Sequence, residues 1–397
     1  MKKILSLLLS CILVFSLAAC GNTDNKDSKD SKDNKETNSS VPESSLAVND
    51  TATPHNLGCI LYGKEDNFGA TVYAELNHAA DALGSTINWS LGDYDATAQI
   101  TAAENLIAAG VEGIIILPLS DTAVQKIAAL CEQNKVYLAL MNRTITDETI
   151  KAEVESHEYY LGCCFEDEVT ASYQLMEYME AAGRKMLGIC YISEGTSIAD
   201  RNKGTRNALA ELDLTQVTEM TNPQDGDVSV VESTIYNMLT TNSNMDGFIS
   251  LSAGSGFGET YLSVFAQVYG EGKDDVSIAC FDTFEGIEKA FEDGVVTVCA
   301  AGTTPDSLFV FMMLYNAVDG HRLSETPVEL NQNYIFATSA EECAILTAYC
   351  DNPNFMLYTS EDILDMAVCL NPDFNMDKMV EIMESYNIDW VVEHVAQ

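Results

Sequence analysis

The chain has 397 residues, of which 61 are Asp or Glu and only 20 are Lys or Arg, so its formal net charge at pH 7 is −41. This excess argues against electrostatic binding to nucleic acid or to an anionic lipid surface. It does not select a ligand, because solvated carboxylates on the surface explain it as well.

The first residues have the pattern of an export signal. Lys2 and Lys3 precede an apolar run over residues 4–19, which is too short to span a bilayer comfortably. The run ends in Leu17-Ala18-Ala19-Cys20, which resembles the bacterial lipobox. We therefore expect residues 1–19 to be a lipoprotein signal peptide and Cys20 to carry lipid, so that the protein is exported and anchored to the outer face of the cell membrane. The alternatives are an ordinary signal peptide and an uncleaved anchor.

Residues 20–55 are predicted to form a disordered tether. This segment is rich in Asn, Asp, Lys, Ser and Thr and has almost no large apolar residue, so it cannot bury enough surface to offset its ordering entropy. The remaining stretch of about 340 residues is too long for one compact core and favours two domains.

Strand-like and helix-like stretches alternate after the tether. The first series has these segments: Leu57–Leu61, Phe68–Leu83, Thr86–Leu91, Ala96–Ala109, Gly113–Leu117, a helix from Asp121, and Val136–Leu140. Continuous apolar strands such as Gly113–Leu117 are typical of a parallel sheet covered on both faces. The fold class is therefore α/β, with an open doubly wound sheet.

A second series of strands follows Glu158–Cys164 and predicts a second lobe. Its strands are Met186–Tyr191, Gly247–Leu251, Val276–Phe281 and Val295–Cys299, with helices between them. We expect a three-crossing hinge near Phe165, Gly302 and Ile335–Thr338. The N-terminal lobe then comprises residues 56–165 plus 304–335, and the C-terminal lobe residues 166–303 plus 336–397. Ligands bind such sheets outside the carboxyl ends of the strands, so two facing lobes form a cleft.

The last part of the C-terminal lobe is predicted to be a helical extension packed on one lobe. Its helices cover Ala340–Tyr349, Ser360–Val368 and Asn375–Tyr386. The third helix overlaps a partial match to a calcium loop, but Lys378 stands where that loop needs Gly, so we predict a helix and no metal. The Gly254–Gly258 stretch lacks the spacing of a phosphate-binding loop and favours a tight turn from strand to helix.

The cysteines do not have the pattern of a metal or redox site. Ten of the twelve lie beyond Cys20, no pair has Cys-x-x-Cys spacing, and several, such as Cys190 and Cys280, lie inside apolar strands. We expect mostly free, buried thiols.

Several fragments, taken in order, resemble the type I periplasmic binding proteins for sugars. They are Asp66-Asn67-Phe68, Ala109-Gly110-Val111-Glu112-Gly113-Ile114-Ile115, Leu140-Met141-Asn142-Arg143, Gly195-Thr196-Ser197 with Arg201, Cys280-Phe281-Asp282 and Thr303-Thr304-Pro305-Asp306. The resemblance covers about residues 56–338, and no single motif in it is highly specific. It implies a sugar held between the lobes by aromatic rings and by polar side chains at its rim.

At the start of the first helix the resemblance implies that Phe68 stacks on the sugar and that Asp66 and Asn67 bond its hydroxyls. The alternatives are a core Phe and two helix-capping residues. Asn142 and Arg143 follow the fourth strand, where ribose binders carry Asp-Arg. The Asn puts ribose itself in doubt, and a surface Arg without a ligand is the alternative for Arg143.

In the second lobe the resemblance implies a cleft position for Arg201 and a carboxylate at Asp282 that accepts from hydroxyls. A helix cap is the alternative for Asp282. Ser252 stands in a run of small residues where relatives carry Asn-Asp, and Thr303 stands where ribose binders carry Gln. Both departures indicate a ligand other than a simple pentose.

The resemblance implies a solute-binding protein that captures a small polar ligand, a sugar, and hands it to the membrane subunits of an ABC importer. It implies a monomer that needs no cofactor, binds no nucleic acid and is not an enzyme. The alternatives are a sensor of the same fold for a chemoreceptor or kinase, and a receptor for a nucleoside or signalling molecule. A secreted Rossmann-like enzyme is a weaker alternative because the sequence has no nucleophile elbow or nucleotide fingerprint.

Overall fold

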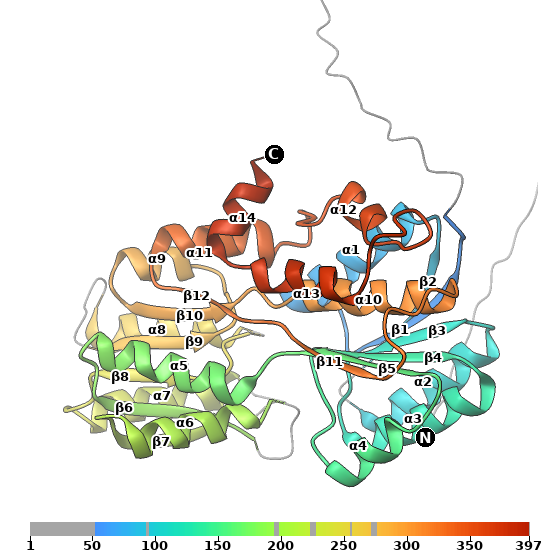
Figure 1. Cartoon of the computed structure of the whole chain (residues 1–397). Coiled ribbons are helices and arrows are strands. Elements are labelled where there is room, and N and C mark those ends of the chain that lie inside the picture. Colours follow the sequence, from blue (N-terminus) through green and yellow to red (C-terminus); the bar gives the residue numbers. More distant parts are fainter. Residues whose placement is uncertain are drawn as a thin grey trace, which may run out of the picture. The chain divides into compact units, whose positions relative to one another are not determined.

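The computed structural model describes residues 52–92, 95–193, 198–222, 228–254, 256–270 and 276–396 (Figure 1). The predicted signal peptide, Cys20 and nearly all of the predicted tether lie outside the described residues, as do Gly195, Thr196 and Ser197. Residues 52–55 of the predicted tether are described, and His55 is buried, with its ring 3.2 Å from Asp319 Oδ1. Within the described part of the chain no helix is long and apolar enough to cross a membrane.

The first sheet contains six parallel strands in the order β11-β5-β4-β3-β1-β2. Its strands are β1 (Asn56–Leu61), β2 (Thr86–Leu91), β3 (Gly113–Ile116), β4 (Tyr137–Met141), β5 (Tyr160–Phe165) and β11 (Val328–Asn331). Five helices accompany this sheet: α1 (Asn67–Ala82), α2 (Ala96–Ala108), α3 (Asp121–Asn134), α4 (Glu148–Val154) and α10 (Pro305–Val318).

Strand β3 explains why both faces of this sheet are covered. Successive side chains of a strand point to opposite faces, so Ile114 and Ile116 pack on one side and Ile115 on the other. The Ile114 side packs against α2, α3 and α4, whereas the Ile115 side packs against α1 and α10. The continuous apolar run thus supplies side chains to the apolar layers on both faces of the sheet. This confirms the predicted doubly wound sheet.

The second sheet has the order β12-β10-β9-β8-β6-β7, and only β12 runs antiparallel to its neighbour. Its strands are β6 (Met186–Ile192), β7 (Thr215–Asn222), β8 (Gly247–Ser250), β9 (Ser277–Phe281), β10 (Val296–Ala301) and β12 (Ile335–Ala337). Its helices are α5 (Glu168–Ala181), α6 (Asp200–Glu211), α7 (Val228–Thr241), α8 (Phe257–Tyr269) and α9 (Ile287–Glu292). Helices α5 and α6 pack on one face and α7, α8 and α9 on the other.

Three segments carry the chain between the two sheets. The first lies between β5 and α5, the second between β10 and α10, and the third between β11 and β12. The first two agree with the predicted crossings near Phe165 and Gly302. The third covers residues 332–334, slightly before the predicted Ile335–Thr338, because Ile335–Ala337 already forms β12 in the second sheet.

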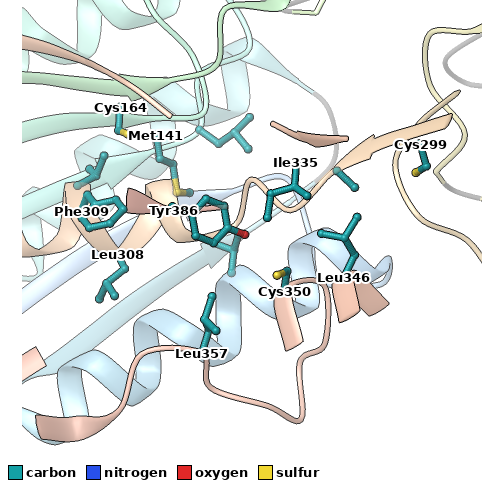
Figure 2. Packing of buried hydrophobic residues seen from close by; sticks show 14 of the residues in the cluster. Met141, Cys164, Cys299, Leu308, Phe309, Ile335, Leu346, Cys350, Leu357 and Tyr386 are labelled. Atoms are coloured by element: carbon teal, nitrogen blue, oxygen red, sulfur yellow. The ribbon is translucent and has the colours of Figure 1, made fainter. Parts of the chain in front are cut away.

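The sequence predicts an extension packed on one lobe, but the C-terminal extension contacts helices of both sheets. It contains α11 (Ala340–Ile345), a π-helical turn (Leu346–Cys350), α12 (Ser360–Asp365), α13 (Met376–Ser385) and α14 (Ile388–Val395). Helix α11 packs against α9, whereas α12 packs against α1 (Figure 1). Figure 2 shows Tyr386 in the same apolar cluster as Phe309 of α10 and Cys299 of β10.

Two further local predictions are confirmed. Asn375 caps α13 by accepting from Lys378 N, so the partial calcium-loop match is a helix, and Gly256 with φ 85° begins α8 as a tight turn. All ten described cysteines are free, and nine of them are buried.

Candidate functional site

Five of the polar residues predicted from the sequence follow the ends of parallel strands. Asn142 and Arg143 follow β4, Ser252 follows β8, Asp282 follows β9 and Thr303 follows β10. Asn142 and Asp282 have φ values of 57° and 72°, in the left-handed region that Asn and Asp adopt more readily than most other residues. The chain therefore turns sharply at the carboxyl end of each of these two strands.

Arg201 of α6 is tied to Glu168 of α5 in a buried pair. Its Nε lies 2.7 Å from Glu168 Oε2 and its second terminal nitrogen 3.1 Å from Oε1. The guanidinium also donates to Leu251 O at 2.7 Å and to the Tyr334 hydroxyl at 2.8 Å. Burial disfavours the charged guanidinium, but Glu168, Tyr334 and Asp282 together outweigh this effect and raise the pKa of Arg201. Most donors of Arg201 are thus already used within the protein.

Arg143 reaches the same carboxylate from the first sheet. Its Nη1 lies 3.7 Å from Glu168 Oε1 and 2.5 Å from the backbone oxygen of Asn142. Glu168 therefore joins the two arginines that the sequence predicted, Arg143 from one sheet and Arg201 from the other. Such a bridge fixes both guanidinium groups beside one carboxylate.

Several buried polar atoms close to this bridge have no hydrogen-bond partner among the described residues. They are Asn142 Oδ1, Arg143 Nε, Asp306 Oδ1, and both amide atoms of Gln332. Asn142 and Asp306 are in direct contact, because the Asn142 backbone N–H donates to Asp306 Oδ2. Buried polar atoms in proteins nearly always have partners, so these atoms indicate a place that a polar ligand or water completes.

Two carboxyl groups next to these atoms favour their protonated forms. Burial raises the pKa of Glu166 to about 8, and the neighbouring Glu168 carboxylate adds to the rise. Burial also raises the pKa of Asp306 well above its ordinary value, with Glu166 contributing. Asn142 Nδ2 lies 3.4 Å from Glu166 Oε1. Protonated carboxyl groups can donate as well as accept hydrogen bonds.

Asp282 is not a helix cap, since α9 begins five residues later and is capped by Gly286. Its Oδ2 lies 3.4 Å from both Ser252 Oγ and Gly254 N, so Ser252 and Asp282 are neighbours. Burial raises the pKa of Asp282, and the nearby Arg201 guanidinium opposes the rise. Thr303 is buried and its carbonyl accepts from Asp306 N at 3.2 Å.

At the start of α1 the structure assigns capping to Asp66. Its Oδ1 accepts from Gly69 N at 2.8 Å and its carboxylate also accepts from the Tyr62 hydroxyl. Phe68 is partly buried and packs against the apolar core. Asn67 is exposed, and its side chain donates to the backbone oxygen of Asp351.

Asp351, from the C-terminal extension, links the two predicted regions. Its Oδ2 accepts from Thr283 Oγ1 at 2.9 Å, and Thr283 directly follows Asp282. One residue therefore contacts Asn67 from the first lobe and the Asp282 turn from the second. Burial raises the pKa of Asp351 to about 7, and the Asp282 carboxylate adds to the rise.

Sequence reasoning missed Glu166, Glu168, Gln332, Tyr334 and Asp351. Glu166 and Glu168 come directly after β5, so the rule that ligands meet the carboxyl ends of strands would have found them. Gln332 and Tyr334 lie in the third crossing, which the sequence placed slightly too late. No sequence signal marks Asp351, because its position depends on how the extension packs.

Comparison with known proteins places the fold in a defined family. A family model described as a periplasmic binding protein domain matches residues 57–321. No curated protein matches the sequence of this chain.

Solved structures share the fold at low sequence identity. A galactofuranose binding protein is 17% identical, covers 75% of this chain and 100% of its own, and superposes with a TM-score of 0.63. A solute-binding protein of an ABC transporter from Burkholderia graminis, in complex with D-arabinose, is 18% identical with coverage of 72% and 96% and a TM-score of 0.61. A carbohydrate transporter protein from Acidothermus cellulolyticus, in complex with myo-inositol, is 16% identical with coverage of 75% and 99% and a TM-score of 0.61.

Proposed function

Because the chain belongs to the periplasmic binding protein family, we propose that it is an exported, lipid-anchored solute-binding protein. It captures a small polar ligand, a sugar, between its two lobes as a monomer and delivers it to the membrane subunits of an ABC importer. Closure of the lobes around the ligand is a shift between two conformations that the ligand favours by its extra contacts in one of them. This function needs no cofactor, no nucleic acid and no chemical step.

The observation that carries the proposal is the set of buried polar atoms without partners on Asn142, Arg143, Asp306 and Gln332. They come from the end of β4, from the crossing between β11 and β12, and from the start of α10, which directly follows the crossing after β10. Leaving a buried polar atom unpaired costs about 1–3 kcal/mol, so a ligand that supplies the missing hydrogen bonds gains affinity.

The balance of charges favours a neutral ligand with many hydroxyl groups. Carboxyl groups predominate, from Glu166, Glu168, Asp282, Asp306 and Asp351, and the donors of Arg201 are mostly used within the protein. Protonated Glu166 and Asp306 can donate as well as accept hydrogen bonds, which suits sugar hydroxyls because these also do both. An anionic ligand would instead need free cationic donors, and most of those on Arg201 are already bonded. The galactofuranose, D-arabinose and myo-inositol named for the similar structures are neutral polyols and support this class.

The test is a thermal-shift screen of the mature protein with pentoses, hexoses and inositols, followed by calorimetric titration of the hits. A ligand at 100 times its Kd adds about 2.7 kcal/mol of stability. Arg143→Gln and Asp282→Asn should each weaken binding of a hit at least about tenfold, the loss of one hydrogen bond to a charged group. Arg206→Gln and Asp213→Asn, at exposed positions, are the matched controls. Binding by both site variants at wild-type affinity would refute the site.

Lipid anchoring is tested separately from sugar binding. The wild-type chain should incorporate labelled palmitate and fractionate with membranes, whereas Cys20→Ala should do neither. Equal membrane retention of the Cys20→Ala variant would overturn the anchoring proposal and leave the solute site unaffected.

A further inference from the structure

A groove of about 450 Å³ lies entirely within the C-terminal extension. Its walls come from α12, α13, α14, the segment between α12 and α13, and Tyr358, which lies just before α12. All of these residues follow residue 321, where the match to the binding-protein family ends. The proposed solute site uses none of the residues that line this groove.

Three rings line one side of the groove. Trp390 and His394 stand four residues apart on α14, so they lie on the same face of the helix and stack, with centroids 4.4 Å apart and planes 13° apart. The Tyr358 ring lies 5.5 Å from Trp390 and 5.9 Å from His394. Tyr358 is 3% exposed, so this wall is held by the core beneath it.

Charged residues at the groove are mainly acidic. Asp362, Asp365 and Glu381 line it, and Lys378 contributes one ammonium group. Asp362 Oδ2 lies 3.4 Å from His394 Nε2. Apart from His394, the charged side chains that line the groove are three carboxylates and one ammonium group, which favours a cationic occupant.

The buried hydroxyl of Tyr358 lacks a hydrogen-bond partner in the described part of the structure. The other buried polar atom of these rings, His394 Nε2, lies beside Asp362 Oδ2. Packing alone does not explain an aromatic wall that keeps a hydroxyl unpaired beside an open groove.

We propose that this groove is a second binding site, which takes a small organic cation with a quaternary ammonium group. The ammonium is attracted to the faces of electron-rich rings, and this attraction is greatest for Trp and Tyr. The carboxylates that line the groove add electrostatic attraction for the ammonium group, which needs no hydrogen bond to them. The unpaired Tyr358 hydroxyl can form a hydrogen bond with a polar group on the same ligand.

The experiment uses choline chloride as the probe on the mature chain. The chain has two tryptophans, Trp89 and Trp390, so Trp89→Phe leaves Trp390 as the reporter of its own groove. Choline should change the fluorescence of Trp390 saturably at constant ionic strength. The neutral isostere 3,3-dimethyl-1-butanol should give less than about a tenth of the affinity, since it lacks the charge that the rings and carboxylates attract.

Matched charge variants complete the test. Asp365→Asn with Glu381→Gln removes two exposed carboxylates of the groove and should weaken choline binding about tenfold. Asp377→Asn with Glu384→Gln removes two exposed carboxylates of α13 that do not line it and should leave binding unchanged. No saturable response, an equal response to the neutral isostere, or equal loss in both double variants would overturn the proposal. Asp282→Asn should not alter choline binding, which separates this site from the solute site.

Discussion

The Arg201–Glu168 pair should contribute strongly to stability, and replacing Arg201 with Met tests this directly. The substitution removes the hydrogen bonds to Glu168, Leu251 O and the Tyr334 hydroxyl, and it removes a guanidinium that lies 4.0 Å over the Phe281 ring. Glu168 remains buried, with Arg143 at 3.7 Å as its nearest remaining cation.

The expected loss of folding stability comes from the Glu168 carboxylate, which stays buried without its main partner. Removing one partner of a buried ion pair destabilises a protein by about 3–5 kcal/mol, because the other charge stays buried. Arg143 offsets part of this, so we expect the lower end, about 3 kcal/mol. For a lobe of this size that corresponds to a fall in Tm of about 6–12 °C. Replacing both Arg201 and Glu168 with Met should recover at least half of the loss, since no charge is then stranded.

Differential scanning calorimetry at neutral pH measures these changes for each unfolding transition. Arg206→Met, on the same helix α6 but at an exposed position, is the matched control and should change Tm little. A loss below about 1 kcal/mol for Arg201→Met, or a double variant as unstable as the sum of its singles, would refute the reasoning.

Three other predictions follow from buried groups. Burial raises the pKa of Glu75 from 4.5 to about 8, although Ser307 donates to it, so the folded protein holds a proton there that the unfolded chain releases. Glu75 should therefore leave stability unchanged below the unfolded pKa and lower it by about 3 kcal/mol between about pH 5 and about pH 8, and Glu75→Gln should flatten this decline in urea titrations. Tyr386→Phe removes the 2.6 Å hydrogen bond to Gly302 O and should cost about 1–2 kcal/mol in the same assay, with Tyr178→Phe at an exposed position as control. In native protein that begins after Cys20, a thiol reagent should modify Cys369 first and the nine buried thiols only on unfolding, which absorbance of the released chromophore measures.

The sequence predicted most of the two sheets because their central strands are unbroken apolar runs. Strand β3 is an example, since its three isoleucines supply both apolar layers. The short edge strands β11 and β12 were not predicted, because four and three residues give too little pattern to distinguish a strand from a loop. Strand β7 was missed for a different reason. It lies at the edge of its sheet and consists mostly of polar residues, so it lacks the apolar run that marks the central strands.

For the candidate site, the ends of the strands predicted which residues belong to it. The sequence did not predict what each side chain bonds to. The rule for strand ends selected Arg143 and Asp282, but it does not say which donors the protein itself uses. Arg201 illustrates this, because its fork is bonded to Glu168, a residue 33 positions earlier in the chain. Asp66 illustrates the converse, since the capping role that its residue type favours is the one the structure assigns.

The C-terminal extension contacts the segments that any movement of the lobes must involve. Tyr386 donates to Gly302 O and Thr304 donates to Cys350 O at 2.9 Å, and both partners in the body belong to the second crossing. Asp351 contacts Asn67 and Thr283, one from each lobe. A hinge moves by changing the backbone angles of a few residues. The hydrogen bonds that Gly302 and Thr304 make with the extension would differ between open and closed forms, so they would change the free-energy difference between those forms. If the lobes close around a solute as we propose, the extension contributes to the same equilibrium that the solute shifts.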